Sequence, residues 1–126
     1  MDIEQAVVRA LETAVPGKVY AAAAIKGAAA PFVFYVLHRD EAVEELDGDT
    51  TLRAATFEVD AVGRGAKDLA ALGARVSAAL KALRGTSGAG LEIQRARVTQ
   101  ESPDIKEREV NLWRRVYALR INYLEV

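Results

Sequence analysis

The stretch LWRRVYALRINY, residues 112–123, has the clearest pattern in the chain. Every second residue from Trp113 onward is large and apolar or aromatic, except for Arg115. The intervening positions are more polar, and they are Arg114, Val116, Ala118, Arg120 and Asn122. Because successive side chains of a strand point to opposite faces, this alternation predicts a long strand with one face on a core. The stretch also lacks proline and glycine, which favours an unbroken ladder.

The composition indicates one small globular domain. The chain has 126 residues, enough for one core and short for two, and 51% of them are hydrophobic. The formal net charge of −1 gives no general attraction to nucleic acid or to an anionic membrane. The absence of cysteine excludes disulfides and thiolate metal sites. We also expect no signal peptide and no membrane span.

Two segments have the apolar spacing of amphipathic helices, residues 2–14 and residues 66–83. Asp2 and Gln5 match a capping box at the start of the first segment, in which each side chain bonds the backbone of the other residue. Gly85 follows the second segment at the position where helices commonly end. We therefore predict two helices that each bury one stripe.

Four stretches predict the main strands of a sheet, and they are residues 32–39, 52–62, 91–100 and 112–123. We expect the first two to pair as one antiparallel hairpin and the last two as another. The alanine-rich residues 19–30 are interpreted as a loose connection with room for a short strand at its start. The predicted class is α+β, with four main antiparallel strands in the order α-β-β-α-β-β and two helices packed on one face of the sheet.

The strand at residues 32–39 is apolar on both faces, so both faces should be covered. The second cover comes either from a loop of the same chain or from another subunit. The opposite face of the final strand is too polar for a second core and too apolar for a purely solvated surface. Six residues are therefore candidates for a subunit interface, and they are Val33, Tyr35, Leu37, Arg114, Val116 and Arg120.

Residues 40–51 are predicted to be a polar connection at the end of the first hairpin. They include six acids and no base before Thr50, and these acids are Asp40, Glu41, Glu44, Glu45, Asp47 and Asp49. With a net charge of −1 for the whole chain, the remainder carries +5. Such a run is either a solvated loop that aids solubility or a contact element. Among contacts we favour docking on a basic surface of a partner over the lining of a channel.

No catalytic residue and no metal site is predicted. Glu58 and Asp60 share a strand face and have the chemistry to hold a divalent cation, but solvated carboxylates facing Arg114 or Arg120 fit the pattern better. His38 is the only histidine, which rules out a histidine cluster. We expect alanine at Glu58, Asp60 or His38 to have only the small effects of surface substitutions. No cofactor is expected.

The order of motifs resembles the tail-terminator or tail-completion proteins of long-tailed phages, prophages and gene-transfer agents. After the short first helix come KVY at residues 18–20, an Ala/Gly-rich stretch that ends in PFVFY at residues 31–35, and FEVD at residues 57–60. An Ala/Leu helix flanked by glycine and the stretch RRVYALRI at residues 114–121 follow. The resemblance lies in this order and covers nearly the whole chain.

The resemblance implies a structural protein, not an enzyme, that assembles as a homo-oligomeric ring of six. The ring lies at the head-proximal end of the tail tube, in the neck region of the particle, after synthesis in the host cytoplasm. It ends tube polymerisation and contacts the tail tube protein and the head-tail connector protein. DNA passes through without specific binding, and no membrane is involved. The acidic hairpin departs from the family pattern, so family contacts there do not carry over directly. For its acids, Asp40, Glu41, Glu44, Glu45, Asp47 and Asp49, we expect docking on the tail tube in preference to lining the channel.

Two other classes of protein remain open. One is a small homo-oligomeric ligand-binding α+β domain, which the same core pattern predicts and a pocket with a bound metabolite would favour. The other is an enzyme, which requires a metal ion at Glu58 and Asp60. The ring accounts better for the doubly apolar strand at residues 32–39 and for the half-polar sheet face.

Overall fold

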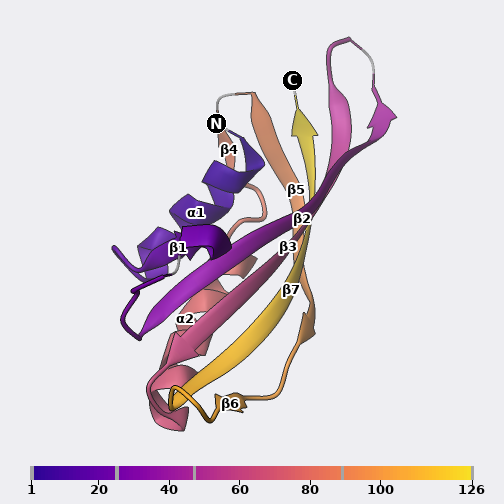
Figure 1. The fold of residues 1–126 in the computed structure, drawn as a ribbon. Helices are drawn as coiled ribbons and strands as arrows, with labels where there is room; N and C mark the ends of the chain where they lie inside the picture. The colour runs from indigo at the N-terminus through magenta and orange to yellow at the C-terminus, as the bar shows by residue number, and fades with distance from the viewer. Residues whose placement is uncertain (1, 25, 47, 89, 126) are drawn as a thin grey trace.

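The computed structural model describes residues 2–24, 26–46, 48–88 and 90–125 (Figure 1). Its helices are α1 (Ile3–Ala14), the 3₁₀ helix η1 (Ala22–Ala24) and α2 (Ala66–Lys81). Its strands are β1 (Val19–Ala21), β2 (Phe32–Glu45), β3 (Thr51–Gly63), β4 (Ser87–Gly88), β5 (Leu91–Glu101), β6 (Ile105–Glu107) and β7 (Leu112–Glu125). Asp2 caps α1 through the predicted capping box with Gln5.

The sheet is mixed and strongly curled, which corrects the predicted set of four antiparallel strands. Within the described residues the sheet has seven strands, in the order β1-β2-β3-β7-β5-β4, with β6 paired to β7 outside this path. β1 runs parallel to β2, whereas the other pairs are antiparallel. The short strand allowed at the start of residues 19–30 is present as β1, whereas β4 and β6 were missed because strands of two or three residues are too short for a recognisable alternation. They form because a longer neighbour offers them hydrogen-bonding partners.

The two predicted hairpin pairings are present within this larger sheet. β2 pairs with β3 and β5 pairs with β7, both antiparallel. β3 also pairs with β7 along its whole length, from Thr51 opposite Glu125 to Gly63 opposite Trp113. β7 is therefore the strand that joins the two halves of the sheet.

The prediction of a polar connection at residues 40–51 is wrong, because β2 continues to Glu45 and β3 begins at Thr51. The outer part of β2 forms a ladder with β3 that ends at the pair Glu45 and Thr51. β1 ends opposite Tyr35, so this part of β2 is an edge strand. Its residues from 38 onward are exposed, so its carboxylates, apart from that of Asp40, stay hydrated and do not oppose the strand.

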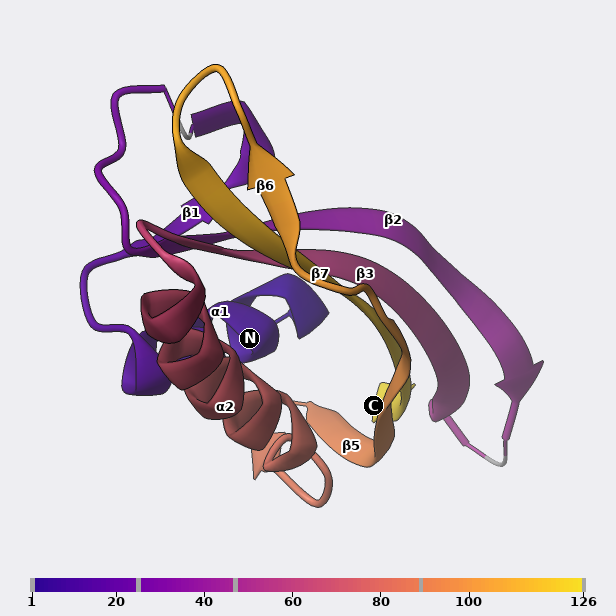
Figure 2. The same cartoon turned by 90° about the horizontal axis from the view of Figure 1, so that it is seen from below.

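The core lies between the concave face of the sheet and the two helices (Figure 2). The alternation in the final strand predicted this face correctly, since Tyr117, Leu119, Ile121 and Tyr123 are at most 1% exposed. The helices contribute their apolar stripes, which include Val7 and Leu11 of α1 and Leu69, Leu72, Val76 and Leu80 of α2.

Gly73 marks the point where α2 lies against β7. A Cβ atom at this position would lie 2.6 Å from Nη1 of Arg115 and 2.8 Å from the hydroxyl oxygen of Tyr117. The Tyr117 hydroxyl donates a hydrogen bond of 3.2 Å to the carbonyl oxygen of Gly73, and Nε of Arg115 donates one of 2.8 Å to Asp104. Both side chains are thus held in place, and glycine allows the close approach.

We predict that Gly73→Ala lowers the free energy of unfolding by roughly 1–3 kcal/mol, because the added methyl group must displace a buried tyrosine. This reverses the usual preference for alanine over glycine in a helix, which is about 1 kcal/mol. Urea denaturation measures the effect. Ser77→Ala in the same helix is the control and should match or exceed the parent protein in stability. A Gly73→Ala protein as stable as the Ser77→Ala protein would contradict this account.

Candidate assembly surfaces

The sheet face opposite α1 and α2, called the outer face below, has an apolar patch that the chain covers itself. Phe32, Phe34 and Val62 pack there with Tyr20 and Ala30. The rings of Tyr20 and Phe32 lie 6.1 Å apart in an edge-to-face arrangement, which aromatic pairs prefer. β1 is the edge strand of the sheet beside β2, and η1, which follows it, lies in Figure 2 on the side of the sheet away from α1 and α2. This part of the outer face therefore needs no second subunit as a cover.

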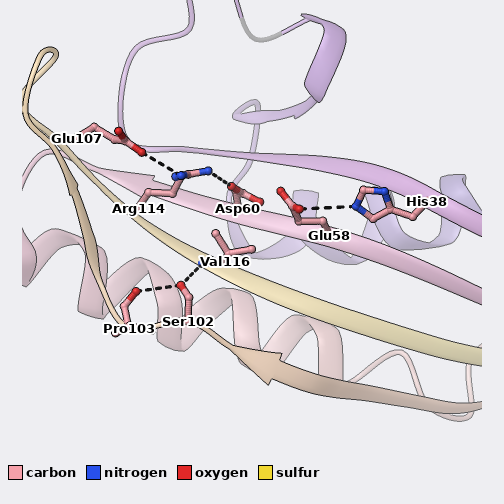
Figure 3. Close-up of polar contacts among 8 residues, drawn as sticks. All are labelled: His38, Glu58, Asp60, Ser102, Pro103, Glu107, Arg114 and Val116. Carbon is pink, nitrogen blue, oxygen red and sulfur yellow. Dashed lines mark hydrogen bonds and ion pairs between the residues drawn. The ribbon is translucent and has the colours of Figure 1, made fainter.

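A row of charged side chains follows the apolar patch along the outer face (Figure 3). Nη1 of Arg114 lies 3.0 Å from a carboxylate oxygen of Asp60, and Nη2 lies 3.0 Å from a carboxylate oxygen of Glu107 in β6. Further along β3, Nε2 of His38 lies 3.6 Å from a carboxylate oxygen of Glu58. The row thus joins β2, β3, β7 and β6 across one surface.

Asp60 is the only charged residue that is fully buried within the described part of the chain. Its Oδ1 atom and the Nε atom of Arg114 are buried and make no hydrogen bond to other described residues. Burial raises the pKa of Asp60 and the neighbouring Glu58 carboxyl raises it further, whereas Arg114 lowers it. The result is a shift from 3.8 to about 7, so the Asp60 carboxyl holds a proton for part of the time near neutral pH.

The sequence predicted Arg114 or Arg120 as the partner of Asp60, and the partner is Arg114, but the predicted solvated environment is wrong. Asp60 does face Arg114, yet it is not solvated, because it lies between Phe34 of β2 and Val116 of β7 and is capped by Arg114. The expectation that alanine at Asp60 behaves as a surface substitution is therefore wrong. A pattern of alternating residues gives the face of a side chain but not what covers that face.

The structure separates the six interface candidates into different environments. Val33 is 0% exposed in the main core, and Tyr35 and Leu37 are half-buried against the same core. Val33 is therefore unavailable to another subunit. Both faces of residues 32–39 are apolar, so periodicity alone could not tell which face turns toward the helices.

On the outer face, Arg114 is occupied by Asp60 and Glu107, and Val116 is half-buried. Arg120 is exposed and lies directly opposite Arg97 of β5. Neither Arg120 nor Arg97 forms an ion pair within the described residues. Like charges opposite each other on a sheet are unfavourable, so this pair offers a place for a partner carboxylate.

The acidic hairpin end, defined here as residues 40–46 and 48–50, includes two acids that are paired within the chain. One is Glu41, which is exposed and lies 3.8 Å from Nη1 of Arg39, and the other is Asp40. The Tyr123 hydroxyl donates a hydrogen bond of 2.7 Å to Asp40, and Nε of Arg53 lies 3.2 Å from the same carboxylate oxygen. The remaining acids are also exposed, and they are Glu44, Glu45 and Asp49. Asp47 lies outside the described residues.

Two apolar side chains stand among these exposed acids. Val43 is 55% exposed and Leu46 is 38% exposed. Sequence reasoning missed them because it treated the segment as a charge run. Their signal was the isolated apolar positions between acids, which a loop that only aids solubility does not require.

A groove lies between α1 and α2 with a volume of about 610 Å³, and it is called the helix groove below. Its charged lining residues are Arg9 and Arg75, and Nη1 of Arg75 donates a hydrogen bond of 3.4 Å to the carbonyl oxygen of Ala14. The rest of the lining is mainly alanine, with Ala6, Ala10, Ala14, Ala78, Ala79, Ala82, Thr13, Leu83 and Thr86. Alanine side chains are too short to fill the space between two helices, which leaves an apolar recess.

The outer face offers no evident metal centre. Within residues 2–24, 26–46, 48–88 and 90–125, no three histidine or carboxylate side chains come together in a way that could hold a metal ion. Among the same residues, no helix has the length and apolar character needed to cross a membrane.

No protein-family model and no curated protein matches the chain. A solved structure described as the virion of a native gene transfer agent particle contains a chain with a similar fold. The two chains are 19% identical, with a TM-score of 0.55. The similarity covers 98% of this chain and 95% of that chain, so it extends over the whole domain.

We predict that the pKa of Asp60 makes the protein less stable as pH rises toward 7. Between the ordinary pKa of 3.8 and about 7, the folded state keeps a proton that the unfolded chain has lost. The free energy of unfolding therefore falls by up to about 1.4 kcal/mol per pH unit from this group. Asp60→Asn lacks this contribution, so its stability relative to the parent should rise from pH 5 to pH 7 and then level off. Urea denaturation at pH 5, 6, 7 and 8 measures this, and a relative decrease would contradict it.

We predict that Arg114→Ala destabilises the fold by about 3 kcal/mol at pH 8, because it leaves the Asp60 carboxylate buried without its cation. The loss should be smaller at pH 5, where Asp60 is protonated. Arg120→Ala is the matched control on the same strand face and should change stability by no more than about 0.5 kcal/mol. Equal losses in the two variants at pH 8 would show that the contact between Arg114 and Asp60 is not structural.

Proposed function

We propose that this chain is a structural subunit of a phage-like particle. Copies, six by the family resemblance, form a ring at the head-proximal end of the tail tube. There the ring ends tube polymerisation and joins the tail to the head connector. The observation that carries the proposal is the similar fold, over 98% of this chain and 95% of the other, of a chain in a gene transfer agent virion. The order of sequence motifs resembles that of tail terminators, and this resemblance supports the proposed location of the subunit at the end of the tail tube.

The surfaces described above support an assembly role. The exposed pair Arg97 and Arg120, the exposed edge of β2 and the apolar residues of the acidic hairpin end lie outside the core. An open sheet edge presents unpaired backbone groups that a partner surface can cover. Neighbouring subunits in a ring give these surfaces defined partners, while DNA passes through without specific binding.

The helix groove supports a second candidate, the small homo-oligomeric ligand-binding domain. Its volume of about 610 Å³ falls in the range of small-molecule sites. Such sites fix their ligands with several convergent polar groups, whereas this lining is mostly alanine with two arginines and two threonines. The structural role therefore fits the chain better.

The proposal predicts a defect in tail length and attachment. In the host that produces the particle, deletion of the gene for this chain should give tubes of uncontrolled length and heads without tails. Negative-stain images of the released particles measure both properties, and expression of the parent gene from a plasmid should restore them. Tails of normal length joined to heads in the deletion strain would contradict the proposed function.

A further inference from the structure

We infer that the acidic hairpin end of one copy docks in the helix groove of a second copy. The inference deepens the proposed function, since it names the contact from which the ring would be built. It replaces the tail tube with a neighbouring subunit as the acceptor of Glu41, Glu44, Glu45 and Asp49. The outer face is the competing acceptor that the test distinguishes.

The helix groove has the chemistry of an acceptor for an acidic segment with apolar side chains. Alanines from both helices leave an apolar recess of about 610 Å³. Its only charged lining residues are Arg9 and Arg75, one from each helix, and both are cationic. An occupant therefore needs small apolar groups for the recess and carboxylates for its rims.

The acidic hairpin end has this combination. Val43 and Leu46 are its exposed apolar residues, at 55% and 38%. Glu44 and Glu45 stand directly between them in sequence, and both are exposed. Burial of Val43 and Leu46 in the recess removes apolar surface from water. The neighbouring carboxylates, which lie among other acids in the free hairpin end, then lie close to the arginines of the groove.

The geometry requires a second copy. The acidic hairpin end is tied to β3 as far as the pair Glu45 and Thr51, and β3 is tied to β7 at Thr51 and Glu125. In Figure 1 this end of the hairpin projects away from α1 and α2, so it cannot reach the helix groove of its own subunit. A contact between two different surfaces is head-to-tail, and such contacts generate closed rings or open filaments.

The exposed pair Arg97 and Arg120 is the strongest competing acceptor within the chain. It offers positive charge on a strand surface of the outer face, where both side chains are exposed. It offers no apolar recess for Val43 and Leu46, whereas the helix groove provides charge and recess together. This difference favours the groove.

The absence of cysteine allows a direct test with single cysteine residues. Val43→Cys in one chain and Ala79→Cys in a second, size-tagged chain should form a mixed disulfide on mild oxidation. The rate should exceed that of Val43→Cys with Val110→Cys about tenfold or more, because docking raises the effective concentration of the two thiols. Added salt should slow the reaction by screening the arginines. Val110 is a fair control because it is 63% exposed and outside the groove lining.

Charge reversal tests the same contact without a covalent bond. Glu44→Lys with Glu45→Lys reverses the hairpin end, and Arg9→Glu with Arg75→Glu reverses the groove. Each double variant alone should lose self-association in sedimentation velocity, because its like charges then face each other. An equal mixture of the two should recover it, which a misfolded variant cannot do.

The outcomes distinguish this inference from the proposed function. Rings that form without the disulfide between positions 43 and 79 would overturn the groove as the acceptor. A disulfide that forms faster between Val43→Cys and Arg120→Cys would do the same. Neither result would contradict the proposed ring. The disulfide in open filaments, with normal tails in the deletion strain, would support the inference and contradict the proposed function. Failure of both the disulfide and the charge rescue up to the highest soluble concentration would overturn the inference.

Discussion

The packing of one face of β7 into the core beneath α2 is the interaction on which the rest of the structure depends. Tyr117, Leu119, Ile121 and Tyr123 are buried on this face, and each contributes apolar area to the core. β7 also pairs with β3, β5 and β6, so its position fixes the register of both halves of the sheet. The close approach of α2 at Gly73 sets the spacing of helix and sheet.

The curl of the sheet follows from the same arrangement and separates the functional surfaces. The helices fill the concave side, while the hairpin of β2 and β3 extends beyond them (Figure 1). The acidic hairpin end therefore lies away from the helix groove of its own subunit. A fold with two such distant and complementary surfaces is suited to head-to-tail assembly.

The sequence predicted well those elements whose side chains alternate over many residues. The inward face of β7, the two helices and the pairing of β2 with β3 all follow from apolar periodicity. It failed at Glu44 and Glu45, where an acidic segment is a strand because its backbone pairs with β3 and its side chains remain in water. Charge indicates exposure, and both loops and edge strands expose their side chains.

The candidate sites show the same limit. Asp60 was placed on the correct face, but its burial depends on Phe34, Val116 and Arg114, which come from two other strands. Val33 was assigned to an interface because both faces of its strand are apolar, and it lies in the core. The helix groove was missed because it arises from the spacing of α1 and α2. The sequence of either helix alone does not indicate that spacing.

We propose that copies of this chain assemble through these two complementary surfaces. The most direct measurement is a cryo-electron microscopy reconstruction of the neck region of the particle that contains the protein. The account predicts a closed ring of six copies, with Val43 and Leu46 of each copy seated between α1 and α2 of the next. Copies that touch only through loops, with the groove empty and the hairpin ends free in solvent, would contradict it.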